Sequence, residues 1–244
     1  MRRLFFPFQR NSFILDGDAF HHWVRVNRAR VGDIIEVVNE AGEVVQAELT
    51  VIEEDRGHMQ VLREIFQEKP WGEITLALGL LKGEKMDWVI QKSVELGVHC
   101  VQPLVMDHSI VKLDTKKKAE RQKRWQKISL EAAQQSGAAQ VPMVKSIRTL
   151  DEVVVEYAEK GTVWVPHEGG RSSYKEALRS DEGAGKHLLI VGPEGGFSER
   201  ETEALKKANA RLVTLGRQIL RAETAAITAL ALMLYEWDYL GGSK

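Results

Sequence analysis

Two glycine-rich segments contain the residues of this sequence best suited to bind a small molecule. Residues 192–196, Gly-Pro-Glu-Gly-Gly, follow the apolar run 188–191, and a segment from Gly216 to Ala225 follows the run 212–215. Glycine lets the backbone adopt positive φ and approach a ligand closely. Neither segment has the G-x-G-x-x-G or Walker A spacing that binds phosphates. The pattern predicts a ligand held mainly by backbone groups; two ordinary strand-to-helix turns are the alternative.

Other patterns for catalysis or metal binding are missing from the sequence. His21 and His22 are adjacent, so they point apart on a helix or a strand and cannot both bind one metal ion without distortion. There is no H-E-x-x-H motif, no pair of C-x-x-C motifs and no G-x-S-x-G nucleophile elbow. Cys100 lies within an apolar run, where a buried side chain is favoured over a nucleophile. We expect no metal.

The composition is that of an ordinary globular protein. The chain has 244 residues, 43% of them hydrophobic and 28% charged, which excludes a disordered tail, a fibrous repeat and a disulfide scaffold. The longest apolar run, 225–235, is too short to cross a membrane and predicts a buried helix. The apolar patch near the N-terminus is too short for a secretory signal. We expect a cytoplasmic protein of one large or two modest domains.

The charges are segregated along the chain although the net charge is only -1. Residues 1–30 carry six arginines against two aspartates, residues 31–72 carry ten carboxylates against three cations, and residues 112–127 carry eight cations against two carboxylates. Such segregation could bind a polyanion on one face while the acidic segment faces away from it. For either basic block alone, a solvated helix face is an equal alternative.

The elements that position these residues fall into two parts. Residues 33–38 and 44–52 predict a hairpin, 59–66 predict a further strand, and Asp16 is the expected N-cap of a short helix. Residues 69–72, Lys-Pro-Trp-Gly, predict a linker.

Strands then alternate with helices, which predicts a parallel sheet covered on both faces. The expected strands are 74–81, 100–105, 162–165, 188–191 and 212–215, and the expected helices are 86–97, 117–135, 149–160, 198–208 and 221–238. Ser198 and Glu201 predict a capping box. Because ligands of such sheets bind beyond the carboxyl ends of the strands, the segments that follow 162–165, 188–191 and 212–215 should form one site.

Six motifs, in order along nearly the whole chain, together resemble one known family. They are Met-Arg-Arg-Leu-Phe at 1–5; His21-His22 with Val24-Arg25-Val26 and Arg28; Lys-Gly-Glu-Lys-Met at 82–86 with Gln91-Lys92 and Glu95-Leu96-Gly97; Glu-Ala-Ala-Gln-Gln-Ser-Gly at 131–137; Gly-Pro-Glu-Gly-Gly-Phe-Ser at 192–198; and Leu215-Gly216 with Ile-Leu-Arg-Ala-Glu-Thr-Ala at 219–225. Each motif alone has little specificity, but their joint occurrence is specific. The chain resembles the ribosomal RNA small subunit methyltransferase E family.

The resemblance implies methylation of N3 of a uridine in 16S rRNA with S-adenosylmethionine as the cofactor. It implies an α/β fold in which residues 1–72 form a PUA-like RNA-binding β-barrel. Residues 73–244 would form a SPOUT methyltransferase domain whose parallel sheet and C-terminal trefoil knot bind the cofactor. The implied partners are 16S rRNA or the small ribosomal subunit, and a second copy of the chain, with the cofactor site near the homodimer interface.

The resemblance and the strand ends together assign site residues. The cofactor would be held by Pro166, His167, Gly192, Glu194, Gly195, Gly196, Leu215, Gly216, Ile219, Leu220 and Arg221. RNA would be held by Arg2, Arg3, Arg10, His22, Arg25, Arg28, Lys82, Lys85, Lys92 and Lys112. The chain departs from the family where Ala138 and Ala139, Gln218 and His108 stand at positions that are often arginine, and each departure removes a cation.

Methyl transfer from a sulfonium needs no metal and no covalent enzyme intermediate. Uridine N3 must lose its proton to attack, which requires a general base or donors that stabilise the anion on O2 and O4. We expect Arg221 to be such a donor. Glu223 could orient Arg221 or accept the proton, and a purely structural salt bridge or a first-turn carboxylate favoured by the helix dipole is an equal alternative.

Two other functions are compatible with the same motifs. A different SPOUT enzyme would methylate a ribose 2'-hydroxyl or a tRNA base. A non-catalytic RNA-binding protein of ribosome assembly would keep the fold without turnover.

Overall fold

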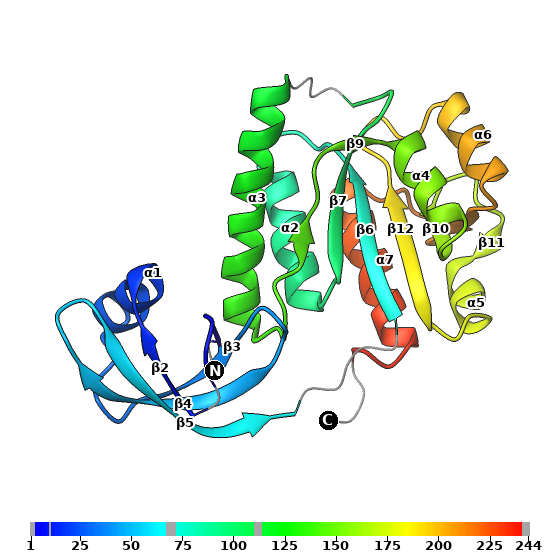
Figure 1. Ribbon diagram of the computed structural model, residues 1–244. Coiled ribbons are helices and arrows are strands. Elements are labelled where there is room, and N and C mark those ends of the chain that lie inside the picture. The colour runs from blue at the N-terminus through cyan, green and yellow to red at the C-terminus, as the bar shows by residue number, and fades with distance from the viewer. Residues whose placement is uncertain (1–2, 10, 67–71, 110–113, 241–244) are drawn as a thin grey trace. The chain divides into compact units, whose positions relative to one another are not determined.

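The chain folds into two compact units (Figure 1). The computed structural model describes residues 3–9, 11–66, 72–109 and 114–240. One unit comprises Met1–Lys69 together with Leu130–Val141, and the other comprises Pro70–Ser129 and Pro142–Lys244. The N-terminal unit therefore includes a segment from the middle of the chain, for which the sequence gives no local signal.

A five-stranded, strongly curved sheet forms the N-terminal unit (blue to cyan in Figure 1). Its order is β1-β3-β4-β5-β2, with strands β1 (Arg3–Phe5), β2 (Ser12–Leu15), β3 (Ile34–Val38), β4 (Val44–Ile52) and β5 (Gly57–Ile65). β3 and β4 form the predicted hairpin, with Val38 opposite Val44. Leu15, Val37 and Leu49 are fully buried in its core, as the alternating pattern of these strands requires.

The predicted short helix of this unit is present in a different form. Helix α1 (Gly17–Phe20) continues into a π-helix, η1 (His21–Val26). Asp16 occupies the predicted N-cap position, although its side chain makes no cap hydrogen bond. Arg28 follows with φ +59°, a conformation that few residues other than glycine adopt.

A parallel sheet forms the C-terminal unit and confirms the predicted α/β class. Its order is β11-β13-β10-β12-β6-β7-β8, and β9 also pairs with β7. The strands are β6 (Gly72–Gly79), β7 (Cys100–Val105), β8 (Met143–Val144), β9 (Arg148–Thr149), β10 (Thr162–Pro166), β11 (Ser172–Ser173), β12 (Gly185–Val191) and β13 (Arg211–Thr214). The five longer strands match the predicted ones to within three residues at each end, whereas β8, β9 and β11 have only two residues each and too short a pattern to predict.

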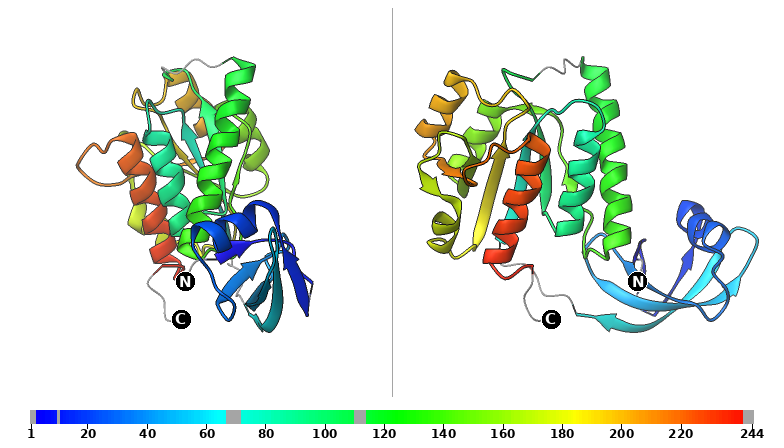
Figure 2. Two further views of the ribbon diagram at one scale, coloured as in Figure 1. Left: turned by 90° about the vertical axis from the view of Figure 1, so that its left-hand side faces the viewer. Right: turned by 180° about the vertical axis from the view of Figure 1, so that it is seen from behind.

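Helices lie on both faces of this sheet (Figure 2). They are α2 (Lys85–Leu96), α3 (Thr115–Ser136), α4 (Leu150–Ala158), α5 (Tyr174–Arg179), α6 (Glu199–Lys207) and α7 (Ala222–Glu236). On one face, Leu188 and Ile190 of β12 pack against Leu150 and Val154 of α4 and Leu205 of α6. On the other face, α7 lies over β6 and β12 and packs against α2. Among the described helices, none has the length and apolarity that a membrane crossing requires.

Candidate active site

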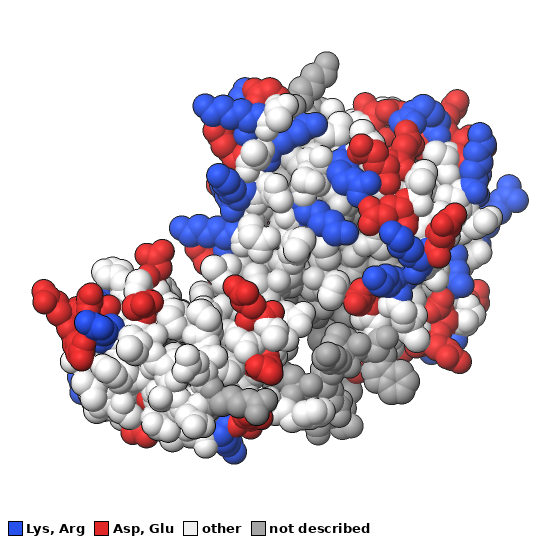
Figure 3. All heavy atoms as spheres, in the orientation of Figure 1, with Lys and Arg blue, Asp and Glu red and all other residues white. Residues whose placement is uncertain are grey.

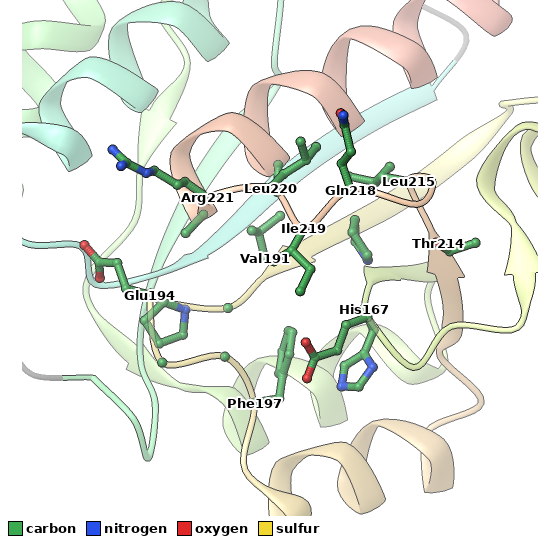
Figure 4. Close-up of a pocket in the computed structure, with 18 of the residues that line it drawn as sticks. His167, Val191, Glu194, Phe197, Thr214, Leu215, Gln218, Ile219, Leu220 and Arg221 are labelled. Atoms are coloured by element: carbon green, nitrogen blue, oxygen red, sulfur yellow. The ribbon is translucent and has the colours of Figure 1, made fainter.

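A cavity of about 630 Å³ lies at the carboxyl ends of β10, β12 and β13 (Figure 4). It is lined by residues 166–168, 191–197 and 214–222 together with Lys85 and Ala225. Every residue predicted to hold the cofactor lines this one cavity. The sheet brings them together because the carboxyl ends of neighbouring parallel strands meet at one edge.

The segment Gly192–Phe197, which we call the glycine loop, follows β12 and forms a tight turn. The amide of Gly196 donates to the carbonyl of Pro193 at 2.9 Å, and Gly196 has φ +69°, which favours glycine. Helix α6 begins directly afterwards with the predicted capping box. There the Glu201 amide donates to Ser198 Oγ at 3.1 Å, while the Ser198 amide donates to Glu201 Oε2 at 2.9 Å.

Neighbouring segments approach the glycine loop closely. A Cβ on Gly79, the last residue of β6, would lie 2.6 Å from the Pro193 nitrogen. A Cβ on Gly195 would lie 2.8 Å from the Cβ of His108, whose Nδ1 donates to the Gly195 carbonyl at 2.8 Å. The sequence marks His108 only as a position where the family often has arginine. Its position just after β7, another strand end, is the signal that could have found it.

Apolar and aromatic side chains form part of the cavity lining. Figure 4 shows Ile219, Phe197 and His167 gathered in this lining. The Ile219 side chain is 85% exposed, and the rings of His167 and Phe197 lie 5.7 Å apart between centroids. Gly216, with φ +129°, lets the chain turn back over the cavity before Ile219. An exposed apolar side chain beside backbone polar groups suits a ligand with a flat, uncharged ring.

One cation and two carboxylates form a cluster at the cavity wall. The Lys85 ammonium lies 3.3 Å from Glu194 Oε1 and 3.3 Å from Glu223 Oε1. The hydrogen bond with Glu223 raises the pKa of Lys85 despite the opposing effect of burial. Burial opposes ionisation of Glu194, but hydrogen bonds from its own amide, the Lys82 amide and Lys85 together lower the pKa of this carboxyl.

Arg221 and Glu223, the predicted catalytic pair, lie in different surroundings. Arg221 is exposed, lines the cavity and occupies the N-cap position of α7. Within the described part of the chain, Glu223 pairs with Lys85 and forms no ion pair with Arg221. Glu223 is not part of the cavity lining, and its Oε2 atom is buried.

The residues predicted to bind RNA lie in both units. Arg3 pairs with Glu36 at 2.7 Å and its side chain is only 10% exposed. Arg25 donates to the Glu54 carbonyl at 2.6 Å and stacks on Phe20.

The other predicted RNA contacts differ in their surroundings. His22 Nδ1 lies 3.4 Å from Asn27 Nδ2, and Lys92 pairs with Glu95 at 2.8 Å. Arg28 and Lys82 are exposed. Arg2, Arg10 and Lys112 lie outside the described residues.

The described cations of the block 112–127 lie on α3. Figure 3 shows Lys and Arg side chains gathered over this helix. Lys116, Lys117 and Lys123 are exposed, while Arg124 pairs with Asp87 of α2. Among the residues that the structure describes, no group of three or more His, Cys, Asp or Glu side chains could hold a metal ion.

Comparison with known families defines the class of protein. A model of the RNA methyltransferase domain matches residues 67–234, and a model of the RNA methyltransferase PUA domain matches residues 15–62. The fold is thus that of an RNA methyltransferase with an N-terminal PUA domain.

Individual relatives narrow this class. The chain is 34% identical over 239 residues to ribosomal RNA small subunit methyltransferase E of Bacillus subtilis, covering 96% of this chain and 93% of that protein. A solved structure of the enzyme of the same name from Neisseria gonorrhoeae, bound to S-adenosyl methionine, has a TM-score of 0.86 at 32% identity and covers 98% of this chain and 99% of the other. A putative methyltransferase from Legionella pneumophila, in complex with the same cofactor, has a TM-score of 0.84 at 29% identity, with 96% of each chain covered.

The chain belongs to the ribosomal RNA small subunit methyltransferase E family. The resemblance found in the motifs is therefore confirmed, and so is the combination of an α/β methyltransferase domain with a PUA domain. The predicted cofactor is the one bound in the Neisseria and Legionella structures. The trefoil knot and the homodimer stay predictions.

Proposed function

We propose that this protein transfers a methyl group from S-adenosylmethionine to N3 of a uridine in 16S rRNA. The observation that carries the proposal is the cavity at the ends of β10, β12 and β13, lined by backbone groups in a chain whose relatives are rRNA methyltransferases. The relatives' names support rRNA as the substrate, and the choice of N3 comes from the resemblance of the motifs. Action on ribosomal RNA also supports the predicted cytoplasmic location.

The residues present fit the cofactor. The cavity volume lies within the range of about 300–1,000 Å³ that is usual for small-molecule sites. Gly196 and Gly216 both line the cavity, and a Cβ on either would meet no atom within 4 Å, so the glycines leave open space that a side chain would occupy. The lining includes the cations Lys85, Arg217 and Arg221, of which Lys85 is already paired with Glu194 and Glu223. When bound, S-adenosylmethionine supplies a methyl group on a sulfonium, and the predicted cofactor residues would hold it.

Arg221 is the side chain best placed to promote loss of the N3 proton. Arg221 is exposed and lines the cavity, and within the described residues no ion pair occupies its guanidinium donors. N–H groups directed at uracil O2 or O4 would stabilise the anion that forms as the proton leaves. Glu223 acts indirectly, through Lys85, because its carboxylate binds Lys85 and is not part of the cavity lining.

RNA recognition belongs mainly to the N-terminal unit in this proposal. Residues 1–72 would act as the RNA-binding domain and residues 73–244 as the methyltransferase domain, and the match to a PUA model supports this division. Arg28 and Lys82 are the exposed cations best suited to phosphate contacts among those predicted. Arg3 is the least suited, because Glu36 already binds its largely buried guanidinium.

The outer face of α2 and α7 supports the predicted homodimer. Trp88 is 45% exposed, Leu232 43% and Tyr235 63%, on two helices that pack side by side. The described part of α7 is apolar on nearly all its faces, which is typical of a helix buried on both sides. A second copy of the chain would cover this face. Since Lys85 and Arg221 lie at the N-terminal ends of the same helices, the cofactor cavity would adjoin the interface.

Methylation of small ribosomal subunits that lack the modification tests the proposal. After incubation with isotopically labelled S-adenosylmethionine, nucleoside analysis by mass spectrometry should find the label in N3-methyluridine of 16S rRNA. Label in a ribose 2'-O-methyl group or in tRNA would identify a different SPOUT enzyme. Failure to bind S-adenosylmethionine in calorimetry would indicate the non-catalytic RNA-binding protein.

A further inference from the structure

Lys85 has surroundings unlike those of a residue that binds RNA phosphates. Its side chain is 36% exposed, and its ammonium lies 3.3 Å from each of two carboxylates, Glu194 and Glu223. An ammonium already shared by two anions has little net charge left to attract a phosphate. Lys82, three residues earlier, is exposed, and no described ion pair involves its side chain.

The two carboxylates come from different parts of the site. Glu194 is part of the glycine loop, whereas Glu223 lies in the first turn of α7. Lys85 is the first residue of α2, just after the turn that follows β6. The Lys82 amide of that turn also donates to Glu194 Oε1 at 3.3 Å. One side chain thus joins three segments that are far apart in the sequence and meet at the cavity.

Removing the ammonium would leave this cluster electrostatically unbalanced. Glu223 has a side chain only 16% exposed, and its Oε2 atom is buried and accepts no hydrogen bond from the described residues. Without Lys85, Glu223 would lose its ion-pair partner and Glu194 would face a second negative charge. A mostly buried carboxylate without its partner is strongly unfavourable. The two segments would therefore move apart, or one of the carboxylates would take up a proton.

We propose that Lys85 is a positioning residue of the cofactor cavity: its ammonium ties Glu194 of the glycine loop to Glu223 at the start of α7. His108 holds the other side of the loop through the Gly195 carbonyl. The loop is therefore fixed from two sides, which keeps its backbone groups in place for a ligand. This inference rests on the proposed function in taking the ligand to be S-adenosylmethionine.

The first test compares Lys85→Met with Lys85→Arg and Lys82→Met in the full-length protein. Calorimetry with S-adenosylmethionine should show affinity about tenfold weaker for Lys85→Met, the scale of a lost coupling between neighbouring charges. Lys85→Arg, which keeps a cation between the carboxylates, should recover most of that loss. Glu223→Gln should also weaken binding and provides a second variant if Lys85→Met folds poorly.

The salt dependence of RNA binding distinguishes the positioning role of Lys85 from a contact with an RNA phosphate. Lys82→Met should bind RNA more weakly, with a salt dependence shallower by about one unit, as expected for a lost phosphate contact. Lys85→Met should leave that slope unchanged. A Lys85→Met protein with normal cofactor affinity and a shallower salt slope would overturn the inference.

A double-mutant cycle tests the coupling directly. In Lys85→Met, the two carboxylates repel each other, and adding Glu194→Gln removes one of these negative charges. The combined fold-loss of cofactor affinity should therefore be smaller than the product of the two single fold-losses. A combined loss equal to that product would mean that the side chains act independently and would contradict the inference. Because the cycle reads cofactor affinity, it remains valid if the methylated atom is not uridine N3, and absence of cofactor binding by the unaltered protein would count against the proposed function itself.

Discussion

The charged side chains around the cavity differ in whether they already form ion pairs with other residues of the protein. Lys85 pairs with both Glu194 and Glu223. Arg221, in contrast, is exposed at the cavity and has no ion pair among the described residues. A donor can stabilise a developing anion only if its N–H groups are free to point at it. Arg221 is therefore the residue whose loss should affect the chemical step most directly.

Arg221→Ala should lower turnover by about 100-fold or more, the scale of a lost oxyanion-type donor. Binding of S-adenosylmethionine should stay within a few fold, because the backbone groups of the cavity remain. Single-turnover methylation assays and calorimetry measure the two effects. Arg221→Lys keeps the charge but loses the planar fork of donors, so its turnover should lie between those of the unaltered protein and Arg221→Ala. Wild-type turnover in Arg221→Ala would exclude Arg221 from the mechanism.

Among the elements, the glycine loop depends on neighbours that are not part of the cavity. Its turn is closed by its own hydrogen bond from Gly196 to Pro193, and its outer side rests on Gly79 and His108. Close contact with backbone atoms leaves little room for relaxation, so a side chain added there must displace the loop.

Gly79→Ala should therefore weaken S-adenosylmethionine binding although Gly79 does not line the cavity. The added Cβ would lie 2.6 Å from the Pro193 nitrogen and push the loop outward. We expect affinity to fall about tenfold, equivalent to about 1.4 kcal/mol, as measured by calorimetry.

Gly161→Ala is the matched control. It places a Cβ 2.0 Å from the Lys186 carbonyl oxygen, at the opposite, amino-terminal end of β10 and β12. It should lower the midpoint of thermal unfolding while leaving the cofactor affinity of the folded protein unchanged. Equal losses of affinity in both variants would mean that Gly79→Ala acts through general destabilisation.

At the scale of the whole molecule, the distribution of apolar surface predicts the assembly. A helix inside a monomer usually has one polar face, but α7 is apolar on nearly all sides, and α2 beside it exposes Trp88. Exposed apolar residues that gather on neighbouring helices mark an interaction surface, whereas scattered ones do not.

Leu232→Arg should convert the predicted dimer into monomers, because it places an uncompensated charge within the apolar face. Sedimentation equilibrium measures the change. Val155→Arg on α4 is the control, since it makes the same kind of change at a side chain that is 75% exposed and lies on a different helix. If the unaltered protein sediments as a monomer, or Leu232→Arg remains a dimer, this face is not the interface.

Much of the fold and site follows from local sequence patterns. Apolar runs predict the long strands because most residues of β6, β7, β10 and β12 are buried. The pairing of Ser198 with Glu201 predicts the start of α6 because a capping box is a contact within one turn. The segments that line the cavity could be named in advance because parallel strands place their carboxyl ends at one edge.

The contacts that give individual side chains their roles required the tertiary structure. The sequence suggested that Lys85 binds RNA and that Glu223 works with Arg221, but folding pairs Lys85 with Glu194 and Glu223. His108 reaches Gly195 across 87 positions of chain, and residues 130–141 join a unit that otherwise ends at residue 69. Local sequence patterns were enough to predict the longer strands, most of the helices and the ligand-binding turns, because these features depend on residues close together in the chain. The charges that meet depend on the tertiary structure, because ion pairs between distant segments leave no periodicity along the chain.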